Sequence, residues 1–172
     1  MTKTVPGQLQ LIDRHKEANE RTEPGHWEMD TIVSCLKEIG GLLVLIDRLT
    51  RKYVIELIRA INQQAIVEAL KRMKKSKRLG IVKSVTTDNG YEFLDPNKIK
   101  AVLGCSVYYT RAYASYEKGS VENCNRIVRR WYPKGTDFCR YTRKDINALE
   151  TTINSIHRLS LKGMSATQFT VA

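Results

Sequence analysis

Residues 26–58, "HWEMDTIVSCLKEIGGLLVLIDRLTRKYVIELI", contain three strand-like segments in quick succession. The first alternates in polarity, the second is a continuous apolar run, and the third is rich in β-branched and aromatic residues. These segments are residues 26–34, 41–49 and 52–58. The intervening Gly40-Gly41 and Thr50-Arg51 suit hairpin turns. The stretch therefore predicts three antiparallel strands.

Beyond residue 58, helical and strand-like patterns alternate. The expected elements are a helix with apolar positions from Ile61 to Met73, a strand over 81–87, a helix beginning near Pro96, a strand over 105–110, a helix from about Ser120 to Trp131, and a last helix carrying Ile146 to Ile156. This order predicts an α/β fold with a mixed five-stranded sheet, three antiparallel strands followed by two parallel ones, and helices on both faces. We expect residues 1–25 to form an arm or lead-in and residues 26–172 to form one domain.

The charge balance favours a polyanionic partner. The 172 residues carry 29 Lys and Arg against 18 Asp and Glu, a formal net charge of +11. Nucleic acid is favoured over a membrane surface, because no basic amphipathic anchor is evident. The basic run over 71–78 fits either a solvated helix end or a DNA-facing surface. No apolar run reaches the length of a membrane span and the N-terminus lacks a signal-peptide core, so we expect a cytoplasmic protein without a membrane partner.

The four cysteines predict no zinc site. They are spread along the chain without a CxxC pair, and the three histidines do not complete a zinc pattern. We interpret them as buried thiols; they are Cys35, Cys105, Cys124 and Cys139.

The stretch "SVTTDNGYEF", residues 84–93, has two interpretations. Asn89-Gly90 after a β-prone run is typical of a tight hairpin turn, because both residues tolerate positive φ. The same stretch places Asp88 at the end of a strand, where many α/β enzymes hold a catalytic carboxylate.

A second acid, Asp30, lies on the first predicted strand. Side chains alternate along a strand, so His26, Glu28 and Asp30 share one face, while Trp27 and Met29 face the core. A carboxylate in mid-strand beside apolar neighbours is costly to bury. Either a metal ion or a nearby arginine would offset that cost.

The helix "SVENCNRIVRRW", residues 120–131, carries a third acid. On a helical wheel Glu122, Asn125, Arg126 and Arg129 lie opposite an apolar arc that is formed by Val121, Cys124, Ile127, Val128 and Trp131. Taken alone, this is an ordinary surface helix in which Glu122 pairs with Arg126. Together with Asp30 and Asp88, however, Glu122 completes a set of three carboxylates. Carboxylates suit Mg²⁺ or Mn²⁺, and two such ions can promote phosphodiester chemistry.

Three motifs, "GHWEMD", "TTDNGYEF" and "KGSVENCNRIVRRWYPKGTDF", resemble the catalytic core of DDE transposases of the IS-thirty insertion-sequence type, within the wider group that includes retroviral integrases. Asp88 and Glu122 are separated by 33 residues, which is similar to the gap in this group. The resemblance runs from about residue 21 to Asn154. It implies an RNase H-like fold and a polynucleotidyl transferase that cleaves element ends and joins them to target DNA.

The resemblance also implies residue roles. Asp30, Asp88 and Glu122 match the three acids that bind two Mg²⁺ or Mn²⁺ ions and carry catalysis. Four further residues are expected to contact DNA: Arg129, Arg126, Asn125 and Lys118. Trp27, Asn89 and Gly90 are expected to support the site, the last two by shaping the exit of the strand that presents Asp88. DNA is the implied partner, a homo-oligomer is the implied assembly, and no small-molecule cofactor is expected.

The sequence departs from the family pattern in two places. After Asn154 the chain matches the family segment only loosely, and no helix-turn-helix module that reads element ends fits before residue 26. Two rival functions therefore stay open. One is a plain RNase H-like nuclease without strand transfer, and the other is a non-catalytic nucleic-acid-binding remnant of a transposase.

Overall fold

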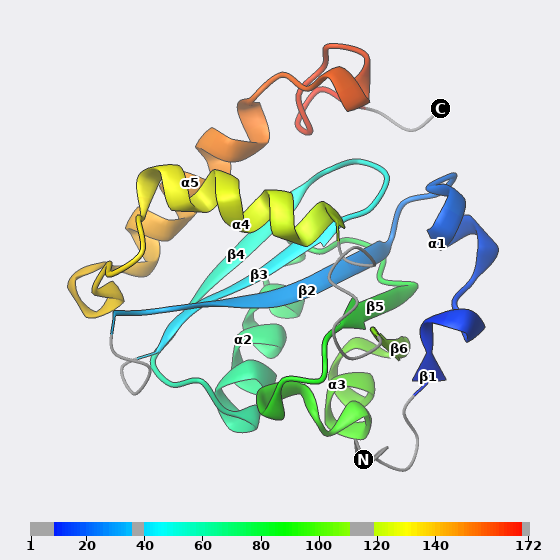
Figure 1. Cartoon of the computed structure of the whole chain (residues 1–172), viewed down its shortest axis with the longest axis horizontal. Helices are drawn as coiled ribbons and strands as arrows, with labels where there is room; N and C mark the ends of the chain where they lie inside the picture. The colour runs from blue at the N-terminus through cyan, green and yellow to red at the C-terminus, as the bar shows by residue number, and fades with distance from the viewer. Residues whose placement is uncertain (1–8, 36–39, 111–118, 170–172) are drawn as a thin grey trace.

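Six strands form one mixed sheet in the order β1-β6-β5-β2-β3-β4 (Figure 1). The computed structural model describes residues 9–35, 40–110 and 119–169, with only the backbone over 119–124. The strands are β1 (Leu9–Gln10), β2 (His26–Val33), β3 (Gly41–Asp47), β4 (Tyr53–Ile58), β5 (Ser84–Thr87) and β6 (Ser106–Tyr109). All five predicted strands are present, and β1, from the segment expected as a lead-in, adds a sixth at the edge.

The four predicted helices are present, and a short helix, α1, forms in the segment that was expected as a lead-in. They are α1 (Lys16–Glu20), α2 (Gln63–Lys75), α3 (Pro96–Leu103), α4 (Gly119–Trp131) and α5 (Arg143–Ser155), with 3-10 turns η1 (Leu11–Asp13), η3 (Tyr91–Phe93), η5 (Phe138–Arg140) and η6 (Leu159–Leu161). The α3 boundaries follow local chemistry: Asp95 caps the first turn, Pro96 occupies it, and Gly104 ends the helix in a left-handed conformation. None of the described helices is long and apolar enough to cross a membrane.

Strand β2 is the central strand of the sheet. It pairs antiparallel with β3 on one side and parallel with β5 on the other. Strand β4 continues the antiparallel part, and β6 pairs parallel with β5. The predicted combination of three antiparallel and two parallel strands is therefore confirmed, and the two parts meet at β2.

Strand β3 is apolar as far as Ile46 because both of its faces are buried. Leu43 and Leu45 pack into the core beneath α2 and α3, whereas Leu42, Val44 and Ile46 pack into the core beneath α4 and α5. Figure 1 shows these two helix pairs on opposite faces of the sheet. The helices thus hold β2, which carries Asp30, from both sides.

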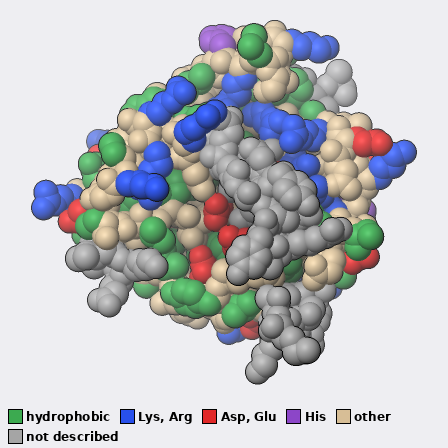
Figure 2. Space-filling view, viewed as in Figure 1, with side chains coloured by type: hydrophobic (Ala, Val, Ile, Leu, Met, Phe, Trp, Pro, Cys, Tyr) green, Lys and Arg blue, Asp and Glu red, His purple; other side chains and the backbone are tan. Residues whose placement is uncertain are grey.

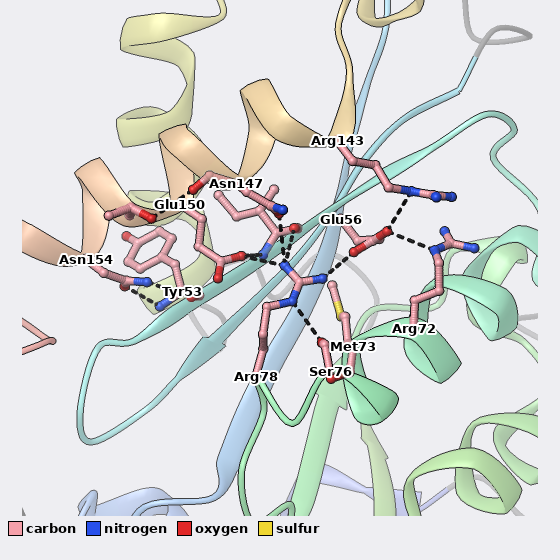
Figure 3. A network of polar contacts seen from close by, with 12 residues as sticks. Tyr53, Glu56, Arg72, Met73, Ser76, Arg78, Arg143, Asn147, Glu150 and Asn154 are labelled. Atoms are coloured by element: carbon pink, nitrogen blue, oxygen red, sulfur yellow. Dashed lines mark hydrogen bonds and ion pairs between the residues drawn. The ribbon is translucent and has the colours of Figure 1, made fainter.

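Helix α5 covers the outer edge of β4 with polar side chains (Figure 3). Asn154 accepts from the Tyr53 amide at 2.8 Å and donates to the Tyr53 carbonyl at 2.9 Å, as a neighbouring strand would. Glu150 accepts from the Ile55 amide at 2.7 Å, and Arg78 donates to the Ile55 carbonyl at 3.1 Å. An exposed edge strand invites pairing with other chains, so these contacts close the sheet at β4.

We expect Asn154→Ala to lower the free energy of unfolding by about 1–2 kcal/mol, because it leaves two backbone groups of Tyr53 without their partner. Thr151→Ala, on the exposed side of the same helix, is the matched control and should change stability little. Urea denaturation of both variants measures the difference. Equal stability of the two variants would contradict this role of Asn154.

Both arginines of the basic run over 71–78, which spans the end of α2, form ion pairs. Glu56 is buried and binds Arg72 at 2.8 Å, Arg143 at 3.2 Å and also Arg78 (Figure 3). Arg78 also pairs with Glu150 at 2.9 Å. These contacts favour a structural role for the arginines of the run over a DNA-facing one.

Two expectations about side-chain burial were wrong. Trp131, placed on the apolar arc, is 42% exposed, because α4 ends there and Tyr132 turns inward against Phe138 instead. Of the cysteines expected to be buried, Cys35 and Cys139 are exposed. Cys105 is buried, and burial raises the pKa of its thiol to about 11. The side chain of Cys124 lies outside the described residues.

Candidate active site

Asp30 lies near the end of β2 and is held by two described hydrogen bonds. The Thr31 amide donates to its Oδ1 at 2.9 Å, and the Asn125 side-chain amide donates to its Oδ2 at 2.7 Å. The side chain is only partly buried, so one side of it remains open to solvent. The predicted face pattern is confirmed: Trp27 and Met29 lie in the core, while Asp30 faces α4.

Asp88 follows β5 directly and lies beside Asp30. In the parallel pairing of β2 with β5, Trp27 is opposite Val85 and Glu28 is opposite Thr86. Asp30 and Asp88 each lie two residues beyond the last of these pairs, Glu28 and Thr86, so they occupy equivalent positions on neighbouring segments. Residues 58 apart in sequence are thereby brought together.

Asn89 and Gly90 do not form the hairpin turn that their sequence suggested. Gly90 has φ −56°, and the chain continues into η3. The Gly90 amide donates to Asp88 Oδ1 at 3.0 Å, and the Asn89 side chain donates to the Thr110 carbonyl at 2.8 Å. The turn therefore holds the Asp88 carboxylate in place and ties it to the end of β6.

Helix α4 packs across β2 and carries four of the other predicted residues, Glu122, Asn125, Arg126 and Arg129. The Asn125 side chain bonds Asp30, and the side chain of Arg126, the next residue, is exposed. Glu122 lies one helical turn before Asn125, and such positions share one side of a helix. The Glu122 side chain and the whole of Lys118 lie outside the described residues.

Arg129 is committed to backbone carbonyls. Its guanidinium donates to Val33 at 3.0 Å, to Pro133 at 3.0 Å and to Tyr132 at 3.4 Å. Burial lowers the pKa of this guanidinium. These bonds join the end of α4 to the end of β2, so Arg129 has a structural role. Contact with DNA remains a prediction for this residue.

A buried ion pair lies on the same face of β2, next to the acids. Glu28 is fully buried and pairs with Arg48, which also donates to the Ala18 carbonyl at 2.7 Å. Arg48 is thus the partner of Glu28, the carboxylate two residues before Asp30 on the same face of β2. Sequence reasoning missed this pair, although Glu28 shares a face with Asp30 and Arg48 directly follows the apolar run of β3.

Sequence reasoning also missed Glu92. This carboxylate is only 9% exposed and accepts from the Thr31 hydroxyl at 2.8 Å. No periodic signal in the sequence singles it out, because it lies in the short turn η3.

The donors present fit a hard divalent cation. Asp30 and Asp88 offer carboxylate oxygens, the kind of ligand that Mg²⁺ and Mn²⁺ prefer. The buried Oδ1 of Asn125, next to Asp30, has no hydrogen-bond partner among the described atoms. The described side chains alone contain no group of three or more His, Cys, Asp and Glu that could hold a metal ion. The third predicted ligand, Glu122, is one whose side chain is not described.

Opposite charges are segregated on the face that carries α4. Acidic side chains gather near the centre of this face, and Lys and Arg side chains lie around them (Figure 2). Such a pattern suits an anionic polymer whose backbone is held at the rim while a cation is bound at the centre.

Known proteins with similar sequences are mainly transposases. The chain is 36% identical over 153 residues to a probable transposase for the insertion-like element IS1161 of Streptococcus salivarius, with 86% of this chain and 41% of that protein covered. It is 30% identical to the transposase for element IS4351 of Bacteroides fragilis, with 91% and 48% covered. It is 28% identical to transposase InsI for element IS30A of Escherichia coli, with 88% and 39% covered.

The resemblance to IS-thirty-type transposases is confirmed. This transposase-like chain spans less than half the length of those three relatives. It matches no protein-family model.

A solved structure shows the same fold. A chain of the simian T-cell lymphotropic virus intasome, in complex with PP2A regulatory subunit B56 gamma, superposes with a TM-score of 0.68. The match covers 83% of this chain and 52% of the viral one at 18% identity. The transposase-like chain therefore has the expected RNase H-like fold, a mixed sheet with helices on both faces.

Proposed function

We propose that this chain is the catalytic core of a DDE transposase, which cleaves phosphodiester bonds at element ends and transfers the resulting 3′-OH into target DNA. One observation supports this most strongly. Asp30 and Asp88 lie at the same level of adjacent strands, beneath the helix that carries Glu122, in a chain similar to transposases. A polynucleotidyl transferase requires such a cluster of acids on a rigid sheet.

Asp30, Asp88 and Glu122 would hold two Mg²⁺ or Mn²⁺ ions. These ions would supply activation of the attacking hydroxyl or water and stabilisation of the leaving oxygen. The protein supplies orientation: Asn125 holds Asp30 at 2.7 Å, and the Gly90 amide holds Asp88 at 3.0 Å. Both carboxylates are thereby fixed before DNA arrives, which reduces the reorganisation needed for reaction.

The basic surface would bind the DNA backbone. The net charge of +11 favours a polyanion, and the affinity should fall steeply as salt rises. Arg126, which is exposed on the helix above Asp30, is the best placed of the predicted DNA contacts whose side chains are described. Transposon ends and target DNA are the proposed partners, and a homo-oligomer would hold paired ends.

The test is Mn²⁺-dependent cutting and joining of a labelled branched DNA that already contains the junction. We expect the chain to release one strand and to form a joined product, with both reactions lost when the metal is chelated. Cutting without a joined product would favour the plain nuclease. DNA binding without any reaction would favour the non-catalytic remnant.

We expect Asn125→Ala to slow the reaction by about 10- to 100-fold, because the partner of a metal-binding carboxylate is removed. DNA affinity should change little if Asn125 acts through Asp30. Single-turnover rates and filter binding separate the two effects. Asn97→Ala, an exposed position on α3, is the control. Weaker DNA binding with an unchanged rate at saturating DNA would instead make Asn125 a DNA contact.

A further inference from the structure

Glu92 occupies an unusual place for a carboxylate. It lies in η3, is 9% exposed, and accepts a hydrogen bond of 2.8 Å from the Thr31 hydroxyl. Thr31 directly follows Asp30 on β2, and its side chain points to the opposite face of the strand. Burying a carboxylate costs free energy that an apolar side chain would not cost. We therefore expect Glu92 to have a role that an apolar side chain could not fill.

Gly90 brings Glu92 against Asp88. A Cβ atom at Gly90 would lie 2.7 Å from Glu92 Oε2 and 3.0 Å from Asp88 Oδ1, so both carboxylates border the space that the glycine leaves free. The φ of −56° is open to any residue, so a larger residue here would be opposed by space rather than by conformation, and it would displace the Glu92 carboxylate. The turn that presents Asp88 is therefore packed directly on Glu92.

Glu92 thus connects the two strands that carry the acids. One of its oxygens is bonded to the residue after Asp30, and the other lies against the turn after Asp88. Strands β2 and β5 pair as far as Glu28 and Thr86, two residues before the acids. Beyond that point the hydrogen bond between Glu92 and Thr31 adds a link between the two segments.

We propose that Glu92 is a positioning residue, which acts through Thr31 and the turn at Gly90 to fix the separation of Asp30 and Asp88 and hence the affinity of the site for metal. The proposal rests on the proposed function, because it takes the two acids as metal ligands. Glu92 acts as a hydrogen-bond acceptor of the right size, and its charge is not essential.

This role predicts a specific ranking of variants in Mn²⁺ affinity. Glu92→Ala and Thr31→Val should each weaken binding by about 10-fold, at the low end of the range for partners of metal ligands. Glu92→Gln keeps a hydrogen-bond acceptor, and Thr31→Ser keeps a hydroxyl. The Mn²⁺ affinity of both variants should stay within about 3-fold of that of the unmodified chain, a smaller change than the loss of about 10-fold. The double variant of Thr31→Val with Glu92→Ala should be no weaker than Glu92→Ala alone, because both remove the same contact.

The experiment is isothermal titration calorimetry of the full chain with MnCl₂, together with thermal unfolding of each variant. Glu150→Ala is the matched control: this carboxylate is also largely buried and bonds the Ile55 amide at the far edge of the sheet. It should lower the melting temperature without changing Mn²⁺ affinity.

Two results would overturn the proposal while the proposed function stands. If Glu92→Gln is as damaging as Glu92→Ala and Thr31→Val has no effect, Glu92 is itself a ligand. If all the variants bind Mn²⁺ as the unmodified chain does and only unfold earlier, Glu92 is merely structural. Failure of the unmodified chain to bind Mn²⁺ would reject the proposed function and this inference together.

Discussion

Asp88→Asn is expected to lower strand cleavage and joining by about 10³-fold or more, since the proposed function makes Asp88 a metal ligand whose loss removes several kcal/mol of transition-state stabilisation. The amide keeps the size of the side chain and can still accept from the Gly90 amide, a bond of 3.0 Å in the structure. The fold and the affinity for DNA should therefore be nearly unchanged. Rates on branched DNA, circular dichroism and filter binding measure the three properties.

The matched control for this variant is Asp95→Asn, seven residues further along the chain. Asp95 caps α3 by accepting from the amides of Asn97 and Lys98, and asparagine caps a helix about as well. Its activity should equal that of the unmodified chain. Activity of Asp88→Asn at the unmodified rate would refute the assignment of this acid.

Arg48→Met is expected to lower the free energy of unfolding by about 3–5 kcal/mol, the largest stability effect predicted for the chain. The variant leaves Glu28 fully buried without its cation and removes the bond to the Ala18 carbonyl. Burial lowers the pKa of the Arg48 guanidinium and Glu28 acts in the opposite direction, so the two charges depend on each other. Urea denaturation at neutral pH measures the loss.

The double variant of Glu28→Leu with Arg48→Met tests the physical reason. It replaces both charges by apolar groups and should recover much of the stability that Arg48→Met loses. If Arg48→Met costs less than about 1 kcal/mol, Glu28 is compensated by other groups and the assigned dependence is wrong.

The strand and helix pattern was predictable because it depends on local periodicity. The apolar run of β3 reflects burial on both faces, and the alternation in β2 separates Trp27 from Asp30. Two of the acids could likewise be found from their positions on β2 and after β5. The register of the sheet then brings Asp30 and Asp88 together, which spacing along the chain alone does not show.

Contacts between distant side chains could not be predicted in this way. Asn125 and Arg129 were both expected at DNA, yet one bonds Asp30 and the other bonds backbone carbonyls at the end of β2. Glu92 lies in a turn without periodicity, and its partner Thr31 is 61 residues away. Such contacts depend on how elements cross, and a helical wheel gives a direction but no partner. The same limit explains the wrong prediction for Trp131. The helical wheel places this residue on the apolar arc, but it lies past the part of α4 that meets the sheet.

On the proposed function, Asp30 and Asp88 hold the divalent cations that support phosphodiester chemistry. The most direct measurement is anomalous diffraction from crystals of the chain soaked in MnCl₂. We predict anomalous density within coordination distance, about 2.0–2.3 Å, of oxygens from both carboxylates, and its loss in Asp88→Asn crystals. Fully occupied manganese elsewhere on the surface, with none at these two acids, would contradict the account.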